Sequence, residues 1–373
     1  MLVALLACVL TSATIAAEDA AEHRIRLGYF VPSDRQPVAN YEQKIRVVMA
    51  MVAELYRSDL RAKGYKTKGL KFENANDQPI VKLIHGTKPA RHYNNAPQYD
   101  ANEQWRRLTP EIRTALGNPQ RKVIIVFAET YDDGPAPHLW PGVMARGAYN
   151  NADGGLAIYT SHILKDGFCA LTVEAQDKLF FDTTPVPGRR AFGEPPNSAR
   201  GKFAEHGIGA VAHELGHALG LPHDHRDDAL DIMGNGFRNL RWNSAPSSAR
   251  RIKFSDDCAR LLMSSRYLAT DLNLKDSQPP TVSARLSVKG GGAIISINAS
   301  DDTGLRAVVF VDSRAGTVVA GRKLEGKRQQ FELTLPPSVV KSGEAAVMAI
   351  VTDDGGNQKR LSVEFGGDKS PRR

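Results

Sequence analysis

Three histidines and one glutamate stand close together in the segment 213–223, which reads HELGHALGLPH. His213 and His217 are four residues apart, so on an α-helix their imidazoles project from one side at successive turns and could hold one tetrahedral zinc ion. Gly220 allows the chain to leave the helix, after which His223 can return as a third ligand. Three protein ligands leave one position open, which is typical of a catalytic zinc site.

Glu214 directly follows the first histidine and is offset from the ligand side of the helix. We expect it to reach a water at the open position and to act as the general base, and not to bind the metal. Met233 follows soon after and is either ordinary core filling or part of a turn beneath the metal; its place just downstream of the ligands favours the turn. The alternative, a helix with incidental histidines, does not account for Gly220 and His223 at their offsets.

The pattern H-E-x-x-H-x-x-G-x-x-H followed by a methionine resembles the signature of the metzincin zinc endopeptidases. The resemblance is specific over residues 213–233 and looser over about 24–270. It implies one catalytic zinc ion, a Met-turn beneath it, and hydrolysis of peptide bonds in a protein or peptide substrate. Asp224 resembles the reprolysin branch, whereas the short path to Met233 resembles the matrixins, so the subfamily stays open.

In metzincins an edge strand above the cleft aligns the substrate by adding it as an extra strand. The candidate in this chain is the apolar segment 154–159, with Gly155, Leu156, Ala157 and Ile158 as the substrate-aligning residues. An ordinary core strand is equally consistent with this segment.

The elements that must position these residues mix strands and helices. Apolar and β-branched runs predict strands at 24–31, 70–73, 80–84, 123–128 and 156–160. Three- and four-residue spacing of apolar side chains predicts helices at 41–63 and 101–116. The resemblance implies an active-site helix around the motif and a terminal helix near 255–268. Segments rich in Gly and Pro, 131–155 and 184–201, are expected to be loops. This order predicts an α/β or α+β layer fold. Taken with the resemblance, it implies an α+β, zincin-like catalytic domain with a mixed β-sheet and an active-site helix, over residues 18–272.

The pattern changes after a linker at 273–280 that contains Gln278-Pro279-Pro280. Residues 281–367 read as about seven short strands separated by turns, which predicts an all-β sandwich of immunoglobulin or fibronectin type. A chain ending near Asp276 is therefore expected to fold alone. The Asp-rich turns at 301–302 and 353–354 could bind calcium, although such residues more often simply form turns. A polysaccharide or a protein remains open as a ligand of this region.

The N-terminal segment 1–17 has a short apolar run followed by small residues, as in an export signal peptide, and predicts secretion. The apolar run 2–10 is too short for an integral membrane segment. After cleavage two cysteines remain, Cys169 and Cys258, either bridged or as separate buried thiols. Residues 368–373 form a polar tail.

The distribution of charge argues against one class of partner. The formal net charge is +8, of which residues 271–373 carry +3 (15 Lys and Arg, 12 Asp and Glu) and residues 1–270 carry +5. Because no basic tract concentrates this charge, nucleic-acid binding is not expected.

Three functions remain in view: a secreted zinc endopeptidase, a zinc hydrolase of non-protein amides such as cell-wall material, and an inactive binding or adhesion protein with a protease fold. The intact Glu214 argues against the last.

Overall fold

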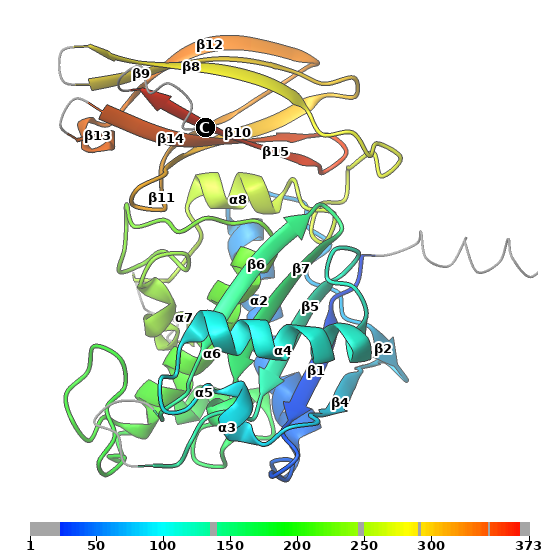
Figure 1. Ribbon diagram of the computed structural model, residues 1–373, viewed down its shortest axis with the longest axis vertical. Coiled ribbons are helices and arrows are strands. Elements are labelled where there is room, and N and C mark those ends of the chain that lie inside the picture. Colours follow the sequence, from blue (N-terminus) through cyan, green and yellow to red (C-terminus); the bar gives the residue numbers. More distant parts are fainter. Residues whose placement is uncertain (1–22, 135–139, 245–249, 290–291, 342–343, 366–373) are drawn as a thin grey trace, which may run out of the picture.

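A computed structural model describes residues 23–134, 140–244, 250–289, 292–341 and 344–365 (Figure 1). The expected signal peptide 1–17 and tail 368–373 lie outside the described residues. Within the described ranges, no helix is both long and apolar enough to span a membrane.

A five-stranded sheet of order β4-β1-β5-β7-β6 forms the centre of the N-terminal region. Strands β1 (Arg26–Val31), β4 (Val81–His85), β5 (Val123–Ala128) and β7 (Gly154–Thr160) are parallel, and β6 (Ala145–Asn151) runs antiparallel to β7 at the edge. Every residue of β5 and β7 is buried. Strands that are apolar on both sides need helices on both faces of the sheet.

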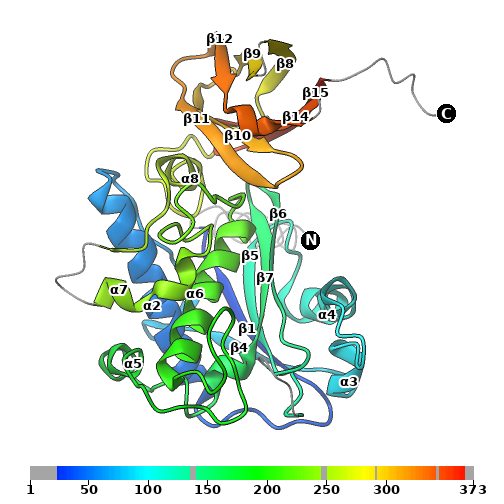
Figure 2. The ribbon, with the colours of Figure 1, turned by 90° about the vertical axis from the view of Figure 1, so that its left-hand side faces the viewer.

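Those helices lie on both faces (Figure 2). Helices α2 (Tyr41–Ala62), α5 (Val173–Leu179) and α6 (Arg200–Ala218) lie on one side, whereas α3 (Ala90–Tyr93) and α4 (Ala101–Leu116) lie on the other. Helix α4 begins after Asp100, whose side chain accepts a hydrogen bond from the Glu103 backbone N–H at 2.8 Å. It ends at Gly117, whose φ of 89° suits a residue without a Cβ.

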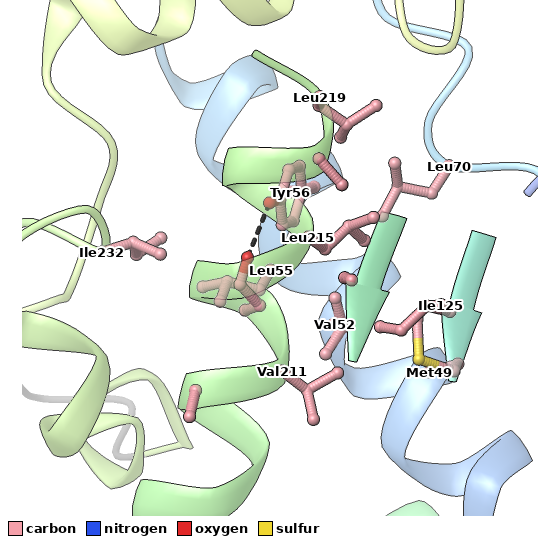
Figure 3. Packing of buried hydrophobic residues seen from close by; sticks show 14 of the residues in the cluster. Met49, Val52, Leu55, Tyr56, Leu70, Ile125, Val211, Leu215, Leu219 and Ile232 are labelled. Atoms are coloured by element: carbon pink, nitrogen blue, oxygen red, sulfur yellow. Dashed lines mark hydrogen bonds between the residues drawn. The ribbon is translucent and has the colours of Figure 1, made fainter. Parts of the chain in front are cut away.

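Helices α2 and α6 pack on each other through a mainly apolar contact (Figure 3). Val52 and Tyr56 of α2 lie beside Val211 and Leu215 of α6. The Tyr56 hydroxyl, fully buried, donates to the backbone oxygen of Ala212 at 2.8 Å (Figure 3). The helix that carries the histidines is therefore fixed to both its neighbour and the sheet.

Shorter elements complete the N-terminal region. They are β2 (Asn74–Ala75), β3 (Gln78–Pro79), η1 (Ser161–Leu164), η2 (Gly236–Asn239), α7 (Arg241–Ser244) and α8 (Asp256–Leu262). The predicted strand at 70–73 is not formed; Phe72 makes only an isolated bridge to Ile25. Residues 145–151, predicted as part of a loop, form β6.

The C-terminal region is all-β, in two antiparallel sheets around a common apolar core. One sheet has the order β11-β10-β14-β13, with β15 also paired to β14, and the other has the order β12-β9-β8. The strands are β8 (Thr281–Lys289), β9 (Gly292–Ser300), β10 (Leu305–Asp312), β11 (Thr317–Lys323), β12 (Arg328–Leu335), β13 (Val340–Lys341), β14 (Glu344–Asp353) and β15 (Gln358–Phe365), with η3 (Pro337–Val339) before β13.

The larger of these sheets packs on the N-terminal region, with α8 directly against β10 and β11 (Figures 1 and 2). Val309, Val311, Val318 and Ile350 belong to the same buried cluster as the apolar residues of α2 and α6. The two regions therefore share a continuous core, which argues against the expectation that residues before Asp276 fold alone.

Both cysteines of the described chain are free and buried. Cys169 contacts the backbone oxygen of Lys44, with its sulfur 3.7 Å away, and Cys258 lies in α8. Of the two possibilities left open for Cys169 and Cys258, the structure has the separate thiols.

Candidate metal centre

Helix α6 carries the first two histidines and ends immediately after them. His213 and His217 lie on consecutive turns, and the helix stops at Ala218. Gly220 follows with φ of 101°, a conformation that side chains rarely allow, and the backbone N–H of Leu221 returns to the oxygen of Gly216 at 2.9 Å. This reversal brings His223 beside the other two imidazoles.

The three imidazoles converge through their Nε2 atoms. Nε2 of His217 lies 3.1 Å from Nε2 of His213 and 3.2 Å from Nε2 of His223. A tetrahedral zinc ion with bonds of ~2.0–2.1 Å would hold its nitrogens about 3.3–3.4 Å apart. The spacing therefore fits such an ion, and these residues form a candidate metal-binding group within the described chain.

Two of the histidines are held in the tautomer that a metal requires. Nδ1 of His213 lies 2.7 Å from the backbone oxygen of Ile232, and Nδ1 of His217 lies 2.8 Å from that of Leu221. A carbonyl oxygen can only accept, so in each ring Nδ1 carries the proton and Nε2 presents its lone pair.

The surroundings of the three rings also keep them neutral. Burial lowers the pKa of His213 well below its ordinary range and that of His217 to about 4, and the neighbouring imidazoles act in the same direction. The pKa of His223 is lowered as well, mainly by burial. Because a protonated imidazole cannot bind a metal, the site favours the ligand form of each ring.

Glu214 directly follows His213 in α6 but is not part of the three-histidine group. Its residue is 9% exposed, and burial raises the pKa of its carboxyl to about 7. The backbone N–H of Gly147 and the charge of Arg146, both on β6, oppose this rise. A carboxylate with a raised pKa, beside a candidate metal site, is suited to take up a proton.

Met233 is fully buried and packs against α6 between the first two histidines. A Cβ added to Gly216 would lie 2.5 Å from the Met233 sulfur, so the side chain occupies the space that the glycine leaves. The backbone oxygen of Met233 accepts from the N–H of Asp224 at 3.0 Å, which ties its turn to the residue after His223.

The segment 154–159 is not an edge strand, and this corrects the sequence-based expectation. Strand β7 lies between β5 and β6, and Leu156, Ala157 and Ile158 are at most 1% exposed. Gly155 faces α6, since an added Cβ would lie 2.0 Å from the backbone oxygen of Ala218. These four residues are core residues that support the helix.

The edge strand beside the site is β6, which the sequence analysis missed. Gly147 of β6 lies so close to α6 that an added Cβ would come 2.0 Å from the backbone oxygen of Glu214. The strand reads ARGAYNN, with glycine and asparagines that are uncommon in strands. One signal in the sequence was the position of this segment. Residues 145–151 are followed by a short turn at 152–153 and then by the apolar strand β7, as in a β-hairpin.

His225 and the Asp-rich turns lie outside the three-histidine group. His225 stacks on His223 at 5.5 Å between ring centres, and its Nδ1 lies 2.6 Å from Oδ1 of Asp228. Asp276, Asp301 and Asp302 lie close together. Asp301 accepts hydrogen bonds from the Thr303 and Gly304 backbone N–H groups, which is the role of an aspartate in a turn.

Comparisons with known proteins find solved structures of similar fold and one matching family. Three crystal structures of OgpA from Akkermansia muciniphila are similar over most of both chains: the wild-type form in space group P 41 21 2 has a TM-score of 0.61 at 17% identity and covers 92% of this chain and 93% of OgpA. The catalytically inactive form in complex with an O-glycopeptide substrate has a TM-score of 0.62 at 17% identity and covers 93% of each chain. At these identities the likeness shows the fold.

Residues 32–245, more than half of the chain, match the family model described as "Metallopep: Putative peptidase family". No curated protein matches the chain. The matched span contains the three histidines, Glu214 and Met233. The chain thus belongs to the Metallopep family of peptidases.

Proposed function

We propose that this protein is an exported zinc endopeptidase of metzincin type, in which His213, His217 and His223 bind one zinc ion and Glu214 is the general base. The observation that carries the proposal is the convergence of three Nε2 atoms, two of them with lone pairs oriented by backbone carbonyls, beside a buried carboxylate. The pattern of residues 1–17 supports export.

Bound zinc would supply an acidified water and polarise the scissile carbonyl. Glu214 takes the proton of the attacking water and passes it to the leaving amine. The Gly147 N–H beside the carboxyl favours its ionised form before the reaction.

The edge strand β6 replaces β7 as the candidate for aligning the substrate. Its residues Ala145–Asn151 pair only with β7 among the described strands, so one side of β6 remains open for an extended peptide. Membership of a peptidase family favours peptide bonds over non-protein amides. Because inactive OgpA was crystallised with an O-glycopeptide, peptides with and without an O-linked sugar are the substrates to compare.

Two substitutions test the metal and the base separately. Glu214→Ala should leave about one zinc per chain while peptide hydrolysis falls by ~10²–10⁴-fold or more, as for the loss of a general base. His217→Ala should lose zinc and activity together, because one of three ligands is gone. Metal analysis and mass spectrometry of cleaved peptides, with and without a zinc chelator, measure both effects.

The matched controls are Glu174→Ala and His85→Ala, which change exposed residues of α5 and β4. Both should keep zinc and turnover. Near-normal hydrolysis by Glu214→Ala would contradict the role of Glu214 as general base. A full zinc content in His217→Ala would contradict the assignment of the three histidines as the metal site.

A further inference from the structure

The turn that carries the third histidine is hydrogen-bonded to the C-terminal region. The backbone N–H of Val318 donates to the backbone oxygen of His223 at 2.8 Å, in a parallel bridge between His223 and Thr317. Two residues further on, the N–H of His225 donates to Oγ1 of Thr317 at 3.0 Å. Strand β11 thus holds the backbone at His223 and two residues beyond it.

Strand β15 holds the beginning of the same turn. Nη2 of Arg360 donates to the backbone oxygen of Gly220 at 2.8 Å. Its guanidinium also lies over the ring of Tyr149, with Cζ 4.7 Å from the ring centre, so one side chain connects β15, the turn after α6 and the edge strand β6. The Gln358 side chain packs on Gly220, where an added Cβ would lie 2.7 Å from its Nε2.

Apolar packing adds to these hydrogen bonds. Leu219 and Leu221 of the turn belong to the same buried cluster as Val311 and Val318 of the C-terminal sheet. On the other side of the turn, the guanidinium of Arg226 bonds both Asp224 and Asp257, at 2.6 and 2.8 Å. His223 therefore sits on a part of the chain that is fixed from the C-terminal region, whereas His213 and His217 are fixed by their helix.

We propose that the C-terminal β region is part of the metal centre: Thr317, Val318 and Arg360 are positioning residues that hold the 219–225 turn so that His223 already faces the other two imidazoles before the metal arrives. The inference rests on the proposed zinc function. A ligand on a free turn must be ordered when the metal binds, and that ordering costs affinity. Here the hydrogen bonds from β11 and β15 order the turn when the protein folds, so the turn is already ordered when the metal binds.

The experiment uses full-length protein with Thr317→Val, Arg360→Ala and the double variant. Thr317→Val keeps the side-chain shape and removes the acceptor of the His225 N–H; Arg360→Ala removes the donor to Gly220. The controls are Thr334→Val on the distant strand β12 and Lys359→Ala, an exposed cation beside Arg360. Zinc affinity is measured by competition with a chelator, and hydrogen exchange of residues 219–225 is measured on metal-free protein.

Each single variant should weaken zinc binding about three- to tenfold, and the double variant tenfold or more, as for the loss of one or two hydrogen bonds. Exchange in the 219–225 turn should become faster in the metal-free variants, and both controls should match the wild type. Unchanged zinc affinity in the double variant overturns the proposal, as does weaker binding without faster exchange in the turn.

The exchange measurement separates this inference from the proposed function. If the wild type binds no zinc, the proposed function fails, while the metal-free exchange still shows whether β11 and β15 hold His223. Faster exchange confined to the variants supports that positioning, and equal exchange in all proteins overturns it.

Discussion

His213 and His217 owe their common direction to their four-residue spacing, but their tautomers are set by other parts of the chain. The backbone oxygens of Ile232 and Leu221 accept from the two Nδ1 atoms. The spacing is visible in the sequence, since a helix has a fixed period. The carbonyl partners are not, because they depend on the path of the chain after the helix ends.

Asp231, in the turn that contains Met233, offers a test of stability against pH. Its residue is 2% exposed, and burial raises its pKa from 3.8 to about 7, with the charge of Asp224 acting in the same direction. The N–H groups of Met233 and Ser255 and the charge of Arg226 oppose the rise, and the Cys258 thiol also lies nearby. The folded chain therefore holds this proton more tightly than the unfolded chain.

Between about pH 4 and pH 7 the folded state then binds more protons at Asp231 than the unfolded state, so the free energy of unfolding falls as pH rises across this range. Asp231→Asn removes the titrating group. The decrease in the free energy of unfolding between about pH 4 and pH 7 should then be smaller, by up to about 4 kcal/mol. Urea unfolding of metal-free protein at several pH values measures the slope. The exposed Asp77→Asn is the control; an unchanged slope in Asp231→Asn would contradict the prediction.

Among the elements, helices α2 and α4 and strand β5 lie where the sequence predicts them, because each has a strong apolar period and clear ends. The edge of the sheet was assigned to the wrong strand. An apolar run such as 154–160 is typical of a strand buried on both faces, which is what β7 is. Strand β6 has few strand-forming residues and is held by its pairing with β7 and its contact with α6.

The approach of α6 to β7 makes Gly155 a test of helix position. An added Cβ would lie 2.0 Å from the backbone oxygen of Ala218, so Gly155→Ala must push the helix away from the sheet. We expect a loss of about 1–3 kcal/mol in the free energy of unfolding, typical of overpacking. Gly134→Ala is the matched control, because no atom lies within 4 Å of its added Cβ. Chemical unfolding of both variants measures the effect. If Gly155→Ala is as stable as the control, α6 can move away from the sheet without loss of stability.

At the scale of the whole molecule, local patterns predicted most C-terminal strands, but not how their sheet packs on the N-terminal region. Val309 and Ile350 are apolar residues of ordinary strands in the sequence, and only the fold shows that they lie in the N-terminal core. The 273–280 segment is likewise held in place: the Asn273 N–H donates to Asp354 O at 2.8 Å, and Asp276 accepts from the Thr303 hydroxyl at 2.7 Å. Contacts so distant in sequence leave no periodic signal.

A chain ending at Asp276 should therefore fail to form a stable metal centre, contrary to what the sequence alone suggests. Truncation exposes the apolar surface that the C-terminal sheet covers and removes the donor to His223. It also leaves Arg266, which is 7% exposed, without the oxygens of Gly355 and Asn357 that it bonds at 2.8 Å. Arg266 keeps its contacts with Asp153 and with the backbone oxygen of Asp276, but the loss of two hydrogen bonds to a charged group adds to the destabilisation.

The comparison is between this truncation and a chain ending at Phe365, which keeps every described strand. The longer chain should be monomeric, bind zinc and unfold in one cooperative transition with its two regions together, because they share a core. The shorter chain should aggregate or lose zinc. Size-exclusion chromatography, calorimetry and metal analysis measure these properties. If the chain ending at Asp276 is monomeric and binds zinc as tightly as the longer one, the C-terminal region plays no part in the metal centre, and the roles assigned to Thr317 and Arg360 fall with it.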